Sequence, residues 1–179
     1  MNIIKRQKNT CEYNPEILKD YEIFSGLNEN QIDKFCKVIT PIQFNKDDVI
    51  ILEGDPGDSI LILLDGKVEI SQALTLKTNV SQADTREKSL ISLSSDFRPF
   101  FGEMSLFSED DKRSATVKAA SVCGVAKIDK NKFFKICNDN PEIGNQVMQN
   151  IARVLSRRLK QANQNVLKLT TAFSLIIDS

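Results

Sequence analysis

Seven short apolar segments follow one another between residues 38 and 128, with no helix-length segment between them. Each has six to eight residues, is rich in valine, isoleucine and leucine, and is bounded by glycine, aspartate, proline or serine. The segments are VITPIQF (38–44), DVIILEG (48–54), SILILLDG (59–66), KVEISQAL (67–74), KSLISLSS (88–95), SATVKA (114–119) and CGVAKI (123–128). Such a series is typical of β-strands and predicts a sandwich, jelly roll or barrel. The polar segment 77–87 is expected to be an exposed hairpin loop.

Helical patterns flank this region on both sides. A short helix is predicted within residues 14–24, and Asn28 with Gln31 forms a capping-box pattern that opens a second one. After the strands, Asp129 is placed to cap the helical segment KNKFFKIC. Asn140 is then expected to cap a last helix with Pro141 at its first position, where proline is tolerated.

The last helix is predicted to run almost to the end of the chain. Apolar residues recur along it at alternating spacings of four and three, which is the pattern of a coiled-coil seam of roughly 40 Å. The seam consists of Met148, Ala152, Leu155, Leu159, Ala162, Val166, Leu169, Phe173 and Ile176. A second apolar row lies beside it, at Ile143, Val147, Ile151 and Val154. Two apolar rows on one helix favour two contacts, one with the β domain and one with a partner helix. The alternative is that both rows form one wide apolar stripe that packs on the β domain alone.

The segment 101–117, FGEMSLFSEDDKRSATV, combines residues that suit an anionic ligand. Gly102 permits close approach of the backbone, and the residues after it can form a helical turn whose free N–H groups bind anions. Arg113 is predicted to begin a strand at the mouth of a pocket and to offer a bidentate fork, while Ser114 adds a hydroxyl. Glu103 suits a sugar hydroxyl. The alternative for Glu103 and Arg113 is a weak surface ion pair.

Composition excludes several classes of function. The chain has no histidine, which removes histidine metal sites and the Ser-His-Asp triad. Its four cysteines are scattered, and its 24 basic and 24 acidic residues balance, which disfavours nucleic-acid binding. No segment has the length of a signal peptide or a membrane span, so we expect no membrane association and a cytoplasmic location.

Two motifs together resemble the cyclic nucleotide-binding domain of bacterial catabolite activators, protein kinase regulatory subunits and cyclic-nucleotide-gated channels. One is the glycine-bearing strand pair VIILEGDPGDSILILLDG (49–66), and the other is the segment FGEMSLFSEDDKRSA (101–115), which is similar to the family's phosphate-binding cassette. The resemblance covers about residues 22–165. It implies a mainly β fold, a jelly roll (double-stranded β-helix) with helices at the N-terminus and a long C-terminal helix.

The resemblance also implies a site. Glu103 would meet the ribose 2′-hydroxyl, Arg113 and Ser114 the cyclic phosphate, and the C-terminal helix would cover the base. Arg158 falls near the base-contacting positions of that helix, although a solvated arginine is the alternative reading. The candidate ligand-binding residues are Phe101, Gly102, Glu103, Met104, Ser105, Arg113, Ser114, Ala115 and Arg158. Two local departures are the insertion-bearing SSDFRPFFGE before the cassette and the acidic run at residues 109–111.

We therefore expect an N-terminal segment over residues 1–21, a cyclic nucleotide-binding β-roll over 22–138 and a dimerising, capping helix over 139–179. The chain would be a non-enzymatic sensor or regulatory subunit without a cofactor. It would bind cyclic AMP or possibly cyclic GMP, form a homodimer through its last helix and signal to an unknown protein partner. No helix-turn-helix domain fits after that helix within this sequence. The alternatives are a dimerisation module that has lost its ligand, and a cupin-type metalloenzyme or haem sensor, which the lack of histidine disfavours.

Overall fold

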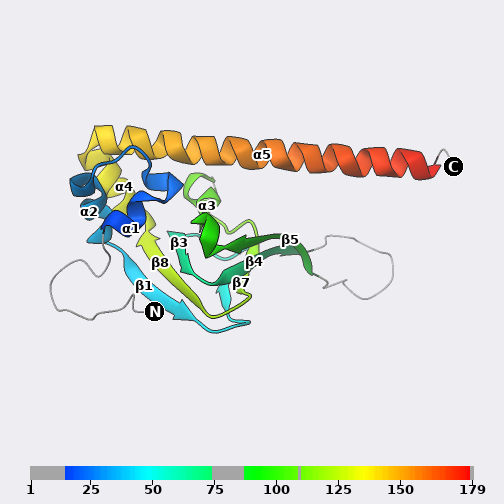
Figure 1. The fold of residues 1–179 in the computed structure, drawn as a ribbon, viewed down its shortest axis with the longest axis horizontal. Helices are drawn as coiled ribbons and strands as arrows, with labels where there is room; N and C mark the ends of the chain where they lie inside the picture. The colour runs from blue at the N-terminus through cyan, green and yellow to red at the C-terminus, as the bar shows by residue number, and fades with distance from the viewer. Residues whose placement is uncertain (1–14, 74–86, 109, 178–179) are drawn as a thin grey trace.

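A computed structural model of the 179-residue chain describes residues 15–73, 87–108 and 110–177. The described strands form two antiparallel four-stranded sheets (Figure 1). The first has the order β1-β8-β3-β6, and the second has the order β2-β7-β4-β5. The strands are β1 Thr40–Phe44, β2 Val49–Ile51, β3 Ser59–Asp65, β4 Lys67–Ala73, β5 Glu87–Ser94, β6 Phe100–Phe101, β7 Thr116–Ala119 and β8 Cys123–Asp129. Two packed sheets of this kind are a jelly roll, one of the three architectures that the strand pattern allows and the one that the family resemblance implies.

All seven predicted strands are present, and the structure adds β6, which has only two residues and leaves no periodic signal. One detail of the strand prediction is wrong. Arg113 does not begin a strand, because β7 starts three positions later at Thr116. Of the predicted hairpin loop, residues 77–86 lie outside the described residues, and Glu87 already belongs to β5.

Strand β3 divides the core in two, because both of its faces are buried. Ile60 and Ile62 point to the helical side, where they pack with the phenylalanines of three helical segments, Phe24, Phe35 and Phe133. Leu61 and Leu63 point to the other side, into the space between the two sheets. The unbroken apolar run of this strand is therefore typical of a strand covered on both faces.

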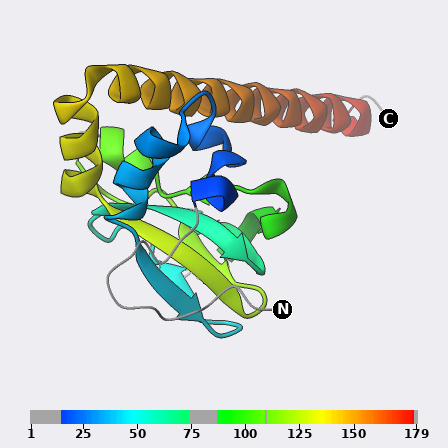
Figure 2. The ribbon, with the colours of Figure 1, turned by 60° about the vertical axis from the view of Figure 1, so that its left-hand side comes forward.

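Four helical segments gather at one end of the roll, as Figure 2 shows. They are α1 Pro15–Lys19, the 3₁₀ turn η1 Glu22–Phe24, α2 Glu29–Cys36 and α4 Lys130–Asp139. The capping box of α2 is confirmed, since Asn28 Oδ1 accepts from Gln31 N and Gln31 Oε1 accepts from Asn28 N. Asp129 caps α4 as predicted.

Asn140 departs from its predicted role at the next helix. Its side-chain Nδ2 donates to the Ile136 carbonyl at the end of α4, over 2.9 Å. Its backbone oxygen nevertheless accepts from Gly144 N in the first turn of the following helix. The side chain thus adds a second hydrogen bond to a carbonyl that also accepts from Asn140 N, and does not cap an N–H group of the next helix.

The last helix, α5 Pro141–Ile177, has 37 residues and runs along the roll and beyond it (Figure 1). The second apolar row predicted from sequence is buried against the domain: Ile143, Val147, Ile151 and Val154. The seam row becomes progressively exposed, and from Asn163 to Ile177 every residue is exposed. The two rows therefore have different environments, and the reading of one wide stripe packed on the β domain is wrong for the second half of α5.

Candidate functional site

A cavity of about 630 Å³ lies between the β roll and α5. Its walls come from β2, β4, β5 and β7, from the segment around β6 and α3 (Met104–Phe107), and from the middle of α5. All nine candidate residues line it: Phe101, Gly102, Glu103, Met104, Ser105, Arg113, Ser114, Ala115 and Arg158. Residues that are up to 57 positions apart in the sequence thus share one cavity of the size that small-ligand sites usually have.

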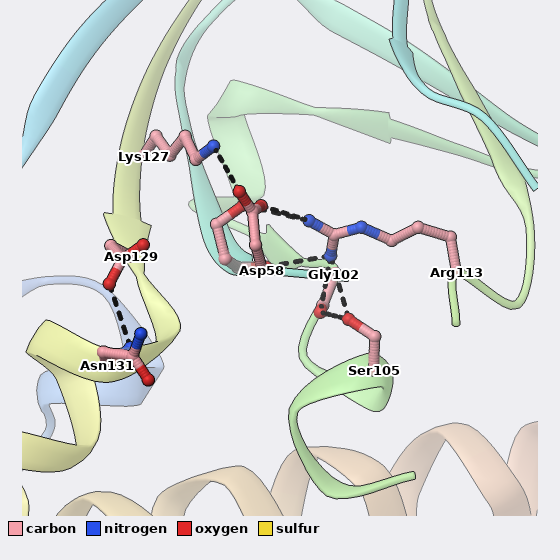
Figure 3. A network of polar contacts seen from close by, with 8 residues as sticks. Asp58, Gly102, Ser105, Arg113, Lys127, Asp129 and Asn131 are labelled. Carbon is pink, nitrogen blue, oxygen red and sulfur yellow. Dashed lines mark hydrogen bonds and ion pairs between the residues drawn. The ribbon is translucent and has the colours of Figure 1, made fainter. Parts of the chain in front are cut away.

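Arg113 is buried, with only 7% of its surface exposed, so the expectation of a side chain at the pocket mouth is wrong. Its Nη1 donates to the backbone oxygens of Ser59 (2.8 Å) and Gly102 (3.0 Å). The same nitrogen lies 3.0 Å from Ser105 Oγ, and Nη2 donates to Ser59 Oγ over 2.9 Å. Figure 3 shows this fork reaching from the loop before β7 to the cassette. The guanidinium therefore ties the cassette to the start of β3.

Asp58 gives this buried cation a counter-charge. Its Oδ1 lies 3.5 Å from Arg113 Nη2, and its Oδ2 accepts from Lys127 Nζ over 3.2 Å (Figure 3). Partial burial raises the pKa of Asp58, but hydrogen bonds from Ser59 and Lys127 and the charges of Lys127 and Arg113 lower it overall. Burial lowers the pKa of Arg113, whereas the carboxylates of Asp58 and Glu103 oppose that change. Arginine titrates so far above neutral pH that Arg113 keeps its charge.

Glu103 is almost fully buried, with 2% of its surface exposed, and has a charge partner that the sequence did not suggest. Arg158 Nη1 on α5 donates to Glu103 Oε1 over 2.5 Å, and Arg158 Nη2 donates to the Phe100 oxygen over 2.7 Å. The Arg158 guanidinium also lies over the Phe100 ring, 5.4 Å from its centroid. This pair is a direct link between the cassette and α5.

Gly102 is a position that requires glycine. Its φ is +79°, a left-handed conformation that other residues adopt at a cost. A Cβ atom there would lie 2.7 Å from Arg113 Nη1 and 3.3 Å from the Ser59 oxygen. The absence of a side chain is therefore what allows the guanidinium to reach the cassette backbone.

The acidic loop beside the cassette is satisfied locally where it is described. Asp110 accepts hydrogen bonds from Ser108 Oγ and from Lys112 N. Both bonds lower the pKa of Asp110, and the bond from Ser108 has the larger effect. Asp111 forms an ion pair with Lys130 at the start of α4. Glu109 lies outside the described residues. The two described carboxylates thus have partners away from Arg113.

Sequence reasoning missed two residues of the Arg113 network, Asp58 and Ser59. Both stand inside the glycine-bearing segment 49–66, directly after Gly57, so the signal was present in a motif interpreted only as turns. Their involvement follows from tertiary packing: β3 lies beside β6, which brings Ser59 next to the cassette. No group of three or more potential metal ligands occurs among the described residues.

These features define a jelly-roll domain with a ligand-sized cavity beneath its last helix. The chain belongs to the cyclic nucleotide-binding domain family, whose sequence model matches residues 41–140. It is 30% identical, over 154 residues, to the CRP-like cAMP-activated global transcriptional regulator of Mycobacterium tuberculosis. That match covers 86% of this chain and 62% of the regulator, so the chain spans less than two thirds of that relative.

A second curated protein and a solved structure are also similar to this chain. The cAMP-dependent protein kinase regulatory subunit of Dictyostelium discoideum is 24% identical over 144 residues, covering 79% of this chain and 41% of the subunit. A solved cyclic nucleotide-binding domain from Methylobacillus flagellatus has the same fold, with a TM-score of 0.71 and 21% identity. That structural match covers 86% of this chain and 80% of the other. No helix in the described part of the chain is long and apolar enough to cross a membrane.

Proposed function

We propose that this chain is a non-enzymatic sensor of a cyclic nucleotide, with cyclic AMP as the expected ligand. The observation that carries the proposal is the convergence of a buried guanidinium, Arg113, and a buried carboxylate, Glu103, on one cavity. A cyclic phosphate needs a cation, and a ribose 2′-hydroxyl needs an acceptor. Cyclic AMP is the expected ligand because the cassette is most similar to that of the bacterial activators, and the similar bacterial regulator is named for cAMP. Cyclic GMP is the alternative, since cGMP-dependent protein kinases are also similar to this chain.

The signal would pass through α5. Arg158 on this helix and the ribose hydroxyl of the ligand would share the Glu103 carboxylate, which makes the position of α5 sensitive to the ligand. A ligand changes this equilibrium only if it binds one arrangement of α5 better than the other. The exposed seam of α5 would pair with a second copy of the chain, and an unknown protein partner would receive the signal.

A second candidate function is a dimerisation module of the same fold that binds no nucleotide. It is favoured by the internal pairing of the cassette, since Arg113 and Glu103 already have protein partners. Structural roles alone would explain those contacts.

Melting temperature and calorimetry distinguish the two functions. For a sensor, cyclic AMP at about a hundred times its Kd should add about 2.7 kcal/mol of stability. For a domain of this size that corresponds to an increase in Tm of roughly 5–10 °C. Calorimetry should give a single site for cyclic AMP and weaker binding for cyclic GMP. An unchanged Tm with both nucleotides at millimolar concentration would favour the dimerisation module.

The ribose contact of Glu103 can be tested with a ligand analogue. The 2′-deoxy form of cyclic AMP should bind the parent protein about tenfold more weakly, because a buried carboxylate oxygen loses its donor. Against Glu103→Ala the same analogue and cyclic AMP should bind equally, since no carboxylate remains to be left unpaired. Isothermal titration of both ligands with both proteins gives the coupling free energy between the 2′-hydroxyl and the Glu103 carboxylate. Equal losses of affinity in the two proteins would mean that Glu103 does not contact the sugar.

A further inference from the structure

Strand β4 contributes an unexpected polar residue to the cavity wall. Successive side chains of a strand point to opposite faces, so Val68, Ile70 and Gln72 share one face. Val68 is fully buried, and Ile70 and Gln72 both line the cavity. The partners of the first two on β5 are Leu93 and Ile91, which line the cavity as well. Gln72 therefore stands where this row is otherwise apolar.

The irregularity in the β4–β5 pairing does not interrupt this row. Ile70 pairs with Ile91, and the next residue, Ser71, pairs with Ser89. The extra residue thus lies on β5, while β4 keeps regular pairing with β7 through Ile70–Val117 and Ser71–Thr116. The alternation of β4 continues to Gln72, in agreement with its place in the cavity wall.

The polar groups at the cassette end of the cavity are already engaged. Arg113 and Ser105 bond to each other and to Gly102, and Glu103 is paired with Arg158. The side chain of Gln72, in contrast, has no hydrogen-bond partner within the part of the chain that the structure describes, and neither has the hydroxyl of Ser156 on α5. An exposed amide with a free donor and a free acceptor in a ligand-sized cavity is available for a ligand.

The apolar part of the cavity wall suits a flat ring. On the sheet side it is formed by Ile70, Ile91 and Leu93, and on the helix side by Leu155, Leu159 and Ala162. Apolar walls with a few placed polar groups are typical of small-molecule sites, in which the polar groups fix the orientation of the ligand. If the cassette end holds phosphate and ribose, as in the proposed function, the base occupies this apolar part.

We propose that Gln72 recognises the edge of the base and selects adenine over guanine. A glutamine amide is complementary to adenine, because its oxygen accepts from the 6-amino group and its nitrogen donates to a ring nitrogen. Guanine presents the oxygen O6 and a ring nitrogen, two acceptors, at the corresponding edge, and so leaves the amide oxygen unpaired. Arg158 was the expected base contact, but both of its terminal nitrogens already donate to Glu103 and Phe100. This inference rests on the proposed function.

The experiment compares Gln72→Met with the parent protein. Methionine keeps the length and volume of the side chain and removes the amide. Gln43→Met is the matched control, because Gln43 is an exposed glutamine on β1 that does not line the cavity. Isothermal titration uses cyclic AMP, cyclic GMP and purine riboside 3′,5′-cyclic monophosphate, the analogue that lacks the 6-amino group.

The parent and Gln43→Met should bind cyclic AMP about tenfold more tightly than either other ligand. Gln72→Met should lose about tenfold for cyclic AMP and bind all three ligands with similar affinity. Unchanged selectivity in Gln72→Met, or equal binding of cyclic AMP and the 6-deamino analogue by the parent, would overturn the role of Gln72. The second comparison needs no variant and holds even if Gln72→Met fails to fold. Failure of the proposed function is distinguishable, because the parent would then bind none of the three ligands.

Discussion

Arg113→Ala should abolish measurable nucleotide binding in the micromolar range and also destabilise the domain. A charge-assisted hydrogen bond contributes about 1.5–3 kcal/mol, so loss of the proposed phosphate contact raises Kd by about ten- to a hundredfold. Loss of the bonds by which Arg113 holds the cassette should weaken binding further. The structural cost arises because the buried guanidinium joins Ser59, Gly102 and Ser105. Removing it takes a donor from these buried oxygens, of which the Gly102 oxygen still accepts from Ser105 Oγ. The cost is about 2–3 kcal/mol in total, which lowers Tm by roughly 5–10 °C.

Two variants separate these effects. Arg157→Ala is the matched control, because Arg157 also lies in a hydrogen-bonded ion pair, with Glu22, but on the exposed surface of α5. Surface pairs contribute little, so its Tm and its affinity should stay close to those of the parent. Arg113→Lys keeps the charge without the fork and should bind with intermediate affinity. Nucleotide binding by Arg113→Ala at the parent's affinity would contradict the phosphate assignment.

Val166→Glu combined with Phe173→Glu should convert a dimer into a monomer. Both residues lie on the seam of α5, and both are more than 60% exposed in the single chain, together with Leu159 and Ile176. Four carboxylates per dimer would enter an apolar interface without partners, at a cost of about 4 kcal/mol or more, which weakens association by at least a thousandfold. Leu159 is left unchanged because it also lines the cavity.

The matched control places the same charges on another face of the same helix. Gln164→Glu with Thr171→Glu has the same seven-residue separation, and both side chains are exposed away from the seam. Light scattering at tens of micromolar should find a dimer for the parent and for this control, and a monomer for the seam variant. Circular dichroism should show a folded β domain in all three. A monomeric parent would contradict the proposed dimer.

The sequence determined most of the secondary structure, because strands, turns and helix caps depend on residues close together in the chain. The choice of a jelly roll among the possible β architectures came from the resemblance to a family. The short segments of valine, isoleucine and leucine between turn residues in 38–128 predicted seven strands, and the structure has all of them. The capping box at Asn28 and Gln31 was predictable because its two hydrogen bonds join residues three positions apart. Two linked motifs also identified the family, which the match over residues 41–140 confirms.

Only the tertiary structure decided how the charged residues of the site are paired. Arg113 was expected at the mouth of a pocket, but the packing of β3 beside β6 surrounds its guanidinium with Ser59, Gly102 and Ser105. Glu103 and Arg158 are 55 positions apart and meet because α5 lies across the cassette. The two apolar rows of α5 were visible in the sequence, but their different burial depends on where the β roll ends beneath the helix. Contacts between distant segments leave no periodic signal, because they depend on the relative placement of whole elements.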